Sequence, residues 1–159
     1  MKPSKTIYTL LLIGISFLIP IASFSQITSY KFEQLDSLQK AEKRNVAVFI
    51  HTNWCKYCHT MQNTTLKNDS IIEQLNKKFY FINLNAEQKK DIVFNGHTFK
   101  YKPTGINTGI HELAEQLATI DNKVTYPTIS FLNTNNEIIF QYNQFINSTN
   151  LDIILKRLK

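Results

Sequence analysis

The sequence predicts an α/β fold in which a central mixed β-sheet carries helices on both faces. Helical and strand-like segments alternate through the first half of the chain, and the run VAVFIH (46–51) is apolar throughout, which is typical of a strand buried on both sides. Two further β-type runs, 128–132 and 137–142, flank the polar turn NTNN and predict an antiparallel pair. With 159 residues, of which 43% are hydrophobic, the chain is long enough for one domain with a proper core.

The first 25 residues have the three-part layout of a secretory signal peptide. A basic start, MKPSK, precedes an apolar run over 10–19, and Ser23-Phe24-Ser25 supplies small residues where a signal peptidase would cut. We expect cleavage before Gln26 and a periplasmic or secreted mature protein. An uncleaved membrane anchor is the alternative, but the apolar run is shorter than the ~20 residues of a spanning helix.

The charges of the mature chain are scattered along the sequence. Without Lys2 and Lys5 it carries 16 basic and 12 acidic residues, a net charge of +4. Acidic residues flank the short lysine pairs, so no one-sided basic stripe with interleaved aromatics forms. We therefore expect no nucleic-acid partner.

The first half of the mature chain predicts a parallel βαβ unit. Apolar residues recur at helical spacing through 30–44, and the strand 46–51 follows. A helical pattern starts near residue 58, and we expect Asn68-Asp69-Ser70 to interrupt it and cap a second segment. The aromatic and branched run FYFINLN (79–85) is the next strand, joined to the first by a right-handed crossover.

The second half predicts a hairpin insertion and then the rest of the sheet. Asn95-Gly96 suits a type I′ turn in a hairpin over 91–101. Gly105 and Gly109 mark a loop, and 110–120 has helical periodicity. After the antiparallel strands at 128–132 and 137–142, side chains from Asn147 to Asn150 can cap a last helix over 151–158.

Both cysteines of the chain lie in the segment HTNWCKYCHTM (51–61), directly after the first strand. C-x-x-C can be a redox dithiol, C-x-x-C-H can attach haem with His59 as axial ligand, and two cysteines with a histidine are most of a zinc site. A haem site would need His97 or His111 as the second axial ligand, opposite His59, and a zinc site would need a fourth ligand from a distant part of the chain. A disulfide across two intervening residues constrains the unfolded chain very little, which favours a reactive role.

Cys55 and Cys58 meet the requirements of thiol–disulfide exchange, because one thiolate attacks a disulfide and a second thiol resolves the intermediate. Dipoles at a helix N-terminus stabilise a thiolate at Cys55, and the charge of Lys56 adds to this effect. We therefore assign Cys55 as nucleophile and Cys58 as resolving thiol. This chemistry needs no metal and no cofactor besides the disulfide.

The motif Trp54-Cys55-Lys56-Tyr57-Cys58 after a strand, together with Tyr126-Pro127-Thr128 before another, resembles the thioredoxin-like superfamily. The resemblance covers residues 30 to 158. Within the superfamily, the chain is most similar to exported thioredoxin-fold proteins and to the C-terminal domain of the periplasmic reductase DsbD. It implies a single thioredoxin-like domain over 26–159, with a thioredoxin fold. It also implies a cis bond before Pro127 and a substrate-binding role for Tyr126 and Pro127; the alternative is a trans proline that opens an edge strand. Trp54 is expected to bind substrate as a hydrophobic lip beside the cysteines, and a core position is the alternative.

The resemblance implies a monomeric thiol–disulfide oxidoreductase that exchanges electrons with protein substrates and a partner dithiol protein. The W-C-K-x-C form of the motif slightly favours a reductase over an oxidase. A non-enzymatic interaction module with a vestigial site is the rival hypothesis.

Two positions depart from the family pattern. The buried Asp that thioredoxins carry six residues before the first cysteine is Phe49 here, and Asn83 stands near the position of its lysine partner. Proton transfer at Cys58 therefore needs another route, and His51 and His59 are the candidates because imidazole titrates near neutral pH. The alternatives are that water takes the proton and that both histidines are ordinary surface or packing residues.

Overall fold

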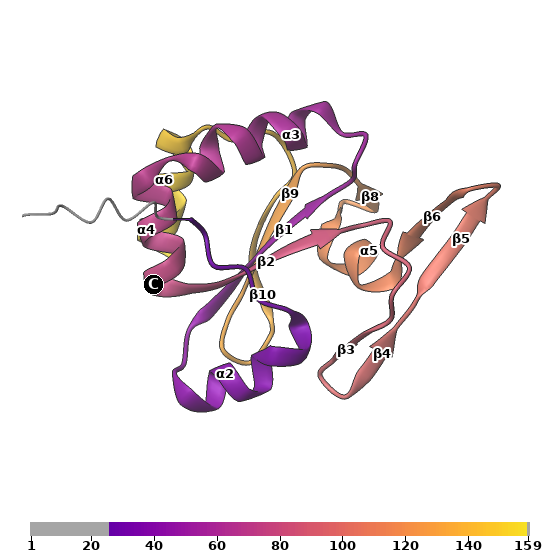
Figure 1. The fold of residues 1–159 in the computed structure, drawn as a ribbon, viewed down its shortest axis with the longest axis horizontal. Helices are drawn as coiled ribbons and strands as arrows, with labels where there is room; N and C mark the ends of the chain where they lie inside the picture. The colour runs from indigo at the N-terminus through magenta and orange to yellow at the C-terminus, as the bar shows by residue number, and fades with distance from the viewer. Residues whose placement is uncertain (1–25, 159) are drawn as a thin grey trace, which may run out of the picture.

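The computed structural model describes residues 26–158, so the predicted signal peptide and its cleavage point lie outside the described residues. The first helical element among the described residues is a 3₁₀ turn, η1 (Phe32–Gln34), which leads into helix α2 (Leu35–Ala41). Figure 1 shows the sheet that follows, with helices on either side of it. Within the part of the chain that is described, none of the helices combines the length and apolar character needed to cross a bilayer.

The central sheet has four strands in the order β10-β9-β1-β2. Strand β1 (Asn45–His51) lies parallel to β2 (Phe79–Asn85) and antiparallel to β9 (Thr128–Leu132). Strand β10 (Ile138–Tyr142) completes the edge next to β9. The predicted βαβ unit, the C-terminal antiparallel pair and the mixed sheet are confirmed.

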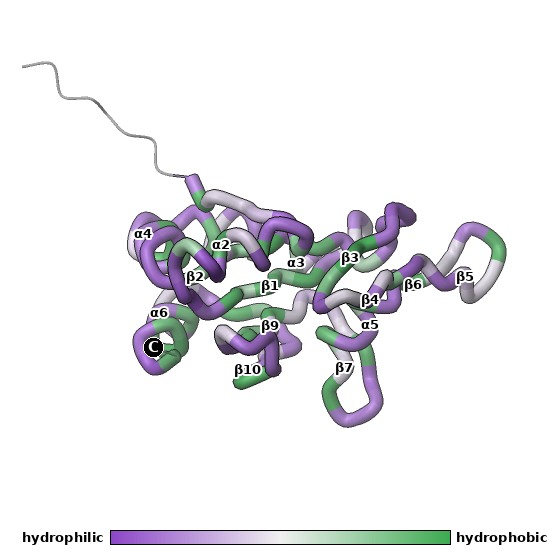
Figure 2. Tube along the Cα trace, turned by 90° about the horizontal axis from the view of Figure 1, so that it is seen from below, coloured by the Kyte–Doolittle hydropathy of each residue, from purple (hydrophilic) through white to green (hydrophobic). Residues whose placement is uncertain are grey.

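Strand β1 is buried on both faces, as its apolar run predicts. Val46, Val48 and Ile50 point into one hydrophobic cluster, and Ala47 and Phe49 point into the other. Helices α2 and α5 (Glu112–Ala118) cover the first face. The second face is covered by the elements α3 (Lys56–Asn63), η2 (Thr65–Lys67), α4 (Asp69–Lys78) and α6 (Ser148–Arg157). Hydrophobic residues concentrate along β1 and β9 in the middle of the molecule (Figure 2).

The predicted helix breaks and caps are present. The Asn68 side chain accepts hydrogen bonds from the backbone amides of Ser70 and Ile71, which starts α4 after the short η2 turn. Asn147 caps α6 in the same way by accepting from the amide of Asn150. These side chains satisfy amides that have no partner within the helix, which fixes where each helix begins.

The predicted hairpin is formed by β3 (Ile92–Phe94) and β4 (His97–Phe99). Asn95 and Gly96 both have positive φ, at 53° and 72°, as a type I′ turn requires.

The prediction of a loop around Gly105 and Gly109 is wrong. That segment forms a second hairpin, β5 (Tyr101–Gly105) and β6 (Thr108–His111), which projects from the body of the protein (Figure 1). Its glycines belong to the strands, and Gly109 lies where a Cβ would meet the ring of Tyr101 at 2.4 Å. The close approach of that ring, rather than a loop conformation, accounts for the glycine.

The helix expected over 110–120 is shorter than predicted. Helix α5 covers only 112–118, because residues 110 and 111 end β6 and residues 119 and 120 start a small hairpin. That hairpin joins β7 (Thr119–Ile120) to β8 (Lys123–Val124) through Asp121 and Asn122, which both have positive φ. Asp-Asn in a primed turn is the local signal that ends the helical pattern.

Candidate active site

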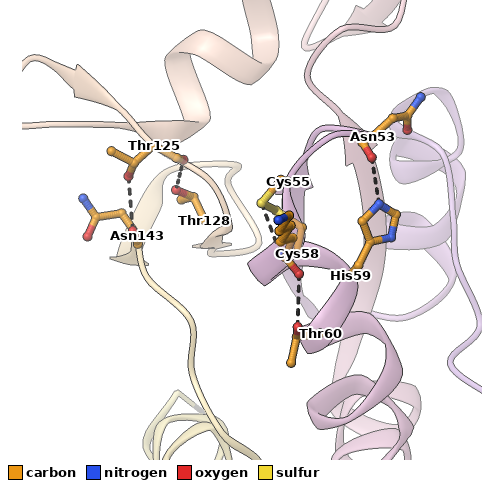
Figure 3. Close-up of a disulfide and its surroundings, with 9 residues drawn as sticks. Asn53, Cys55, Cys58, His59, Thr60, Thr125, Thr128 and Asn143 are labelled. Carbon is orange, nitrogen blue, oxygen red and sulfur yellow. Dashed lines mark hydrogen bonds between the residues drawn. A yellow bond between two sulfur atoms is a disulfide. The ribbon is translucent and has the colours of Figure 1, made fainter.

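Cys55 and Cys58 form a disulfide at the N-terminus of α3, immediately after β1 (Figure 3). Cys55 is the N-cap residue, with extended backbone, and its Sγ accepts a hydrogen bond from the Cys58 amide at 3.1 Å. The Cα atoms of the two cysteines lie 5.2 Å apart. An amide that already points at Cys55 Sγ would stabilise negative charge on that sulfur.

The two cysteines differ in their access to solvent. Cys55 retains 6% of its surface exposed, whereas Cys58 is completely buried among apolar side chains that include Met61 and Ile129. A substrate disulfide can therefore approach Cys55 and not Cys58. This asymmetry matches the separate roles of an attacking thiol and a resolving thiol.

The wall opposite α3 is the turn before β9. The Tyr126–Pro127 peptide bond is cis, which confirms the expectation from the motif, and Pro127 is buried. The hydroxyl of Thr128 donates to the carbonyl of Thr125 at 2.8 Å, and the hydroxyl of Thr125 donates to the carbonyl of Asn143 at 3.2 Å. Figure 3 shows this turn facing the disulfide from the side opposite to Asn53 and His59.

A cavity of about 320 Å³ lies beside Pro127, and no charged side chain lines it. Its walls are Tyr57, Tyr126, Pro127, Asn143, Gln144 and Phe145. Sequence reasoning missed Tyr57 and residues 143–145. Tyr57 could have been found, because it stands between the cysteines on the exposed side of the helix, where 68% of it is accessible. The 143–145 segment follows β10 and reaches the site only through the folded sheet.

Trp54 lies on the surface beside the disulfide, with 66% of its area exposed, and is not a core residue. Its indole Nε1 donates to Glu87 Oε1 at 2.9 Å, and its ring forms a T-shaped contact with the ring of Tyr126 at a centroid distance of 6.2 Å. Burial raises the pKa of Tyr126 to about 12, and the negative charges of Glu87 and Glu115 act in the same direction. The Tyr126 phenol therefore stays protonated at neutral pH. Sequence reasoning did not anticipate Glu87.

The remaining predicted site residues lie around the start of α3. Lys56 is the first residue of the helix and is exposed. His59 is also exposed, and its Nε2 lies 2.7 Å from the carbonyl oxygen of Asn53, so this nitrogen carries the proton and donates.

His51 ends β1 and is half-buried, with its ring stacked on that of Phe49 at 5.5 Å and an interplanar angle of 17°. Burial lowers the pKa of His51, and hydrogen bonding to the Thr52 backbone and to Asn83 opposes this shift only in part. His51 is therefore neutral at neutral pH.

Among residues 26–158, no group of three or more His, Cys, Asp or Glu side chains is placed to hold a metal ion. The positions that the haem hypothesis assigned to thioether bonds are joined to one another as a disulfide. The arrangement is that of a redox dithiol.

A family model described as a thioredoxin-like domain matches residues 32–159. The chain belongs to the thioredoxin-like family. Together with the Cys55–Cys58 disulfide, membership makes it a thiol:disulfide oxidoreductase with a thioredoxin fold. The expected resemblance and fold class are confirmed.

Solved structures of this family share the fold at low sequence identity. A DsbH oxidoreductase superposes with a TM-score of 0.61 at 16% identity, covering 88% of this chain and 89% of that one. A Thermus thermophilus thioredoxin gives 0.58 at 17% identity, covering 83% and 86%. The oxidised DsbD C-terminal domain of Neisseria meningitidis gives 0.55 at 10% identity, covering 80% and 91%. An uncharacterised Archaeoglobus fulgidus protein is 28% identical over 90 residues, which cover 54% of this chain and 71% of that protein.

The structure places both departures from the thioredoxin-like pattern on the sheet face next to the cysteines. Phe49 is completely buried and lies opposite Asn83 in the pairing of β1 with β2. Phe49 and Cys58 belong to the same hydrophobic cluster. An aromatic ring therefore packs in this cluster, at the position where thioredoxins carry an acid.

Proposed function

We propose that the chain is an exported thiol–disulfide oxidoreductase that reduces disulfides in protein substrates. The observation that carries the proposal is the unequal pair of sulfurs. Cys55 is accessible to solvent at a helix N-terminus, where the Cys58 amide donates to its Sγ, whereas the Cys58 side chain is completely buried. A protein that only bound partners would not need one accessible and one buried cysteine at this spacing.

In the reducing direction, the Cys55 thiolate attacks one sulfur of a substrate disulfide and forms a mixed disulfide, and the other substrate sulfur leaves as a thiolate. Cys58 then loses its proton and attacks Cys55 Sγ. This step releases the second substrate thiolate and leaves the Cys55–Cys58 disulfide seen in the structure. A partner dithiol protein returns two electrons and two protons, and no bound cofactor takes part.

The surface around Cys55 supports a protein substrate. Trp54 and Tyr57 are exposed aromatic residues on either side of Cys55, and the uncharged cavity by Pro127 adjoins them. Aromatic and uncharged walls suit an apolar stretch of polypeptide next to the substrate cysteine. Trp54, Tyr126 and Pro127 are the substrate-binding residues in this proposal, and the exposed charge of Lys56 favours the Cys55 thiolate.

Replacing the cysteines one at a time tests the proposal. Cys55→Ser should abolish the reduction of insulin by the protein in the presence of dithiothreitol, because no attacking thiolate remains. Cys58→Ser should still attack and should accumulate a mixed disulfide with the substrate, which mass spectrometry detects. Activity that survives in Cys55→Ser would instead favour the non-enzymatic interaction module.

The direction of electron flow depends on the reduction potential of the Cys55–Cys58 couple. The preference for a reductase rests on the W-C-K-x-C motif. Equilibration with glutathione measures the potential, and a value near that of thioredoxin, about −270 mV, supports a reductase. A value near that of DsbA, about −120 mV, would reverse the assignment to an oxidase.

Export rests on the basic and apolar segments of the first 25 residues. The mass of the protein recovered from its native host tests it, and a mature chain that begins at Gln26 is the expected result. We propose that this mature protein acts as a monomer, which light scattering would check.

A further inference from the structure

Cys58 must lose its proton during the resolving step of the proposed reaction, and its surroundings oppose this. The side chain is completely buried, and its hydrophobic cluster brings together Met61, Phe49 and Ile129. Burial in apolar surroundings raises the pKa of a thiol, so the thiolate forms slowly without a nearby base. At the position where thioredoxins carry a buried Asp, this chain has Phe49.

The sheet face that packs against α3 offers few titratable side chains. Residues of β1 and β2 that point to this face alternate with those that point away, and they include Ala47, Phe49, His51, Phe81 and Asn83. Strands β9 and β10 add Ile129, Phe131, Phe140 and Tyr142. Among these residues His51 alone carries an imidazole, the side chain that most often transfers protons in enzymes.

We propose that His51 accepts the proton of Cys58 during resolution, either directly or through one water molecule. Its ring stacks on Phe49, and Phe49 packs in the same cluster as Cys58. His51 thus lies at the end of the strand that leads to Cys55, on the side of the sheet where the buried sulfur lies. The proposal rests on the proposed thiol–disulfide exchange, and it names the group that accelerates the second step, the attack of Cys58 on the mixed disulfide.

The other basic groups near the cysteines are less suited to the role. His59 donates from Nε2 to the Asn53 carbonyl, on the side of the disulfide away from the Thr125 turn, and is exposed (Figure 3). Lys56 is exposed, and its ammonium group is a hydrogen-bond donor with no acceptor site, so it is not suited to take a proton.

The groups around His51 keep it in the form that accepts a proton. From α3, the electrostatic effect of His59 lowers the pKa of His51. From β2, the neighbouring Asn83 and Asn85 are uncharged, and Glu87 beyond them is engaged with the Trp54 indole. Burial acts in the same direction, so His51 is neutral before the step.

Atoms and electrons balance in the step. The Cys58 S–H proton moves to an imidazole nitrogen of His51, the Cys58 sulfur forms a bond to Cys55 Sγ, and the bond from Cys55 to the substrate sulfur breaks. The substrate leaves as a thiolate and takes a proton from solvent. His51 then returns its proton to water.

The reaction of the reduced protein with 5,5′-dithiobis(2-nitrobenzoate) separates the two steps. Attack by Cys55 releases one thionitrobenzoate, and attack by Cys58 on the resulting adduct releases a second. In the wild type the second phase should become independent of pH once His51 is neutral. In His51→Gln the rate of the second phase should fall about 100-fold or more at neutral pH and recover only as the thiol itself ionises, above pH ~8.5.

Control variants distinguish the possible results of this experiment. In His59→Gln the second phase should reach the same pH-independent rate as in the wild type, because His59 does not take the proton, and Cys58→Ser should release one equivalent only. The first phase reports whether His51→Gln is still folded at the site, and added imidazole should restore the second phase of His51→Ala. Wild-type and His51→Gln profiles that coincide would overturn the role of His51 alone. A wild type that releases no second equivalent would overturn the proposed function itself.

Discussion

Every residue from Val46 to Ile50 in strand β1 is buried, whereas every residue from Lys102 to Thr108 in the β5–β6 hairpin is exposed. The sheet gains its stability from apolar surface buried on both faces, and the cysteines are attached directly to its central strand. The two hairpins of the insertion (92–111) contact the body through a few side chains such as Phe94 and Phe99. The comparison indicates that the dithiol depends on the sheet and that most of the insertion is a surface addition.

Truncation of the core beneath the cysteines should give the largest loss of stability. Phe49→Ala removes a completely buried ring from the cluster that holds Cys58. We expect the free energy of unfolding to fall by about 3–5 kcal/mol, because the cavity is only partly refilled. Urea unfolding of the oxidised protein measures the change as a lower midpoint.

Ile106→Ala is the matched control at the tip of the insertion, where 94% of Ile106 is exposed. Its effect should stay within about 0.5 kcal/mol. A comparable loss in both variants would contradict the view that stability resides in the sheet.

The sequence could predict the sheet because its signals are local and mutually consistent. The apolar run of β1 and the capping asparagines at 68 and 147 specify their elements with little help from the rest of the chain. The second hairpin was missed because residues 102–108 are exposed, so its strands show no apolar alternation.

The candidate site divides in the same way. Cys55, Cys58 and Pro127 stand in motifs with defined spacing, so they could be named from the sequence. Glu87 reaches Trp54, and Phe145 lines the cavity beside Pro127, only because the folded sheet brings the loops after β2 and β10 to the site. Contacts between loops depend on the completed sheet, and no local pattern in the chain encodes them.

The insertion should make stability sensitive to mild acid through His111, which is buried at the end of β6. Its Nδ1 accepts a hydrogen bond from the Leu113 amide and caps α5. Burial lowers the pKa of His111, and the charges of Asp91 and Glu112 oppose this shift in part. Protonation of Nδ1 would also break the cap.

The sign of the pH effect follows from the lowered pKa. Below the unfolded-state value of about 6.5, the unfolded chain binds a proton that the folded chain does not. Stability should therefore be constant above pH ~7 and decrease toward pH ~5 by at most ~1.4 kcal/mol per pH unit from this histidine.

His111→Asn keeps a capping side chain but removes the titration, so its urea midpoint should change less over this pH range than that of the wild type. The exposed His97 supplies the matched control, His97→Asn. Equal pH dependence in His111→Asn and the wild type would show that His111 does not contribute to acid sensitivity.

Shortening the β5–β6 hairpin should have the smallest effect and tests the comparison most directly. Residues 103–109 can be replaced by Asn-Gly, which suits a two-residue turn between Lys102 and Ile110, a pair already opposite each other. The variant keeps the Lys102–Glu115 ion pair at 2.8 Å and the pairing of Tyr101 with His111. Because the removed residues are almost entirely exposed, stability should change by no more than about 0.5 kcal/mol.

Both phases of thionitrobenzoate release from the shortened variant should keep their wild-type rates. A slower first phase would instead show that the projecting hairpin supports the geometry of Cys55, and the division between a catalytic sheet and a surface insertion would be wrong.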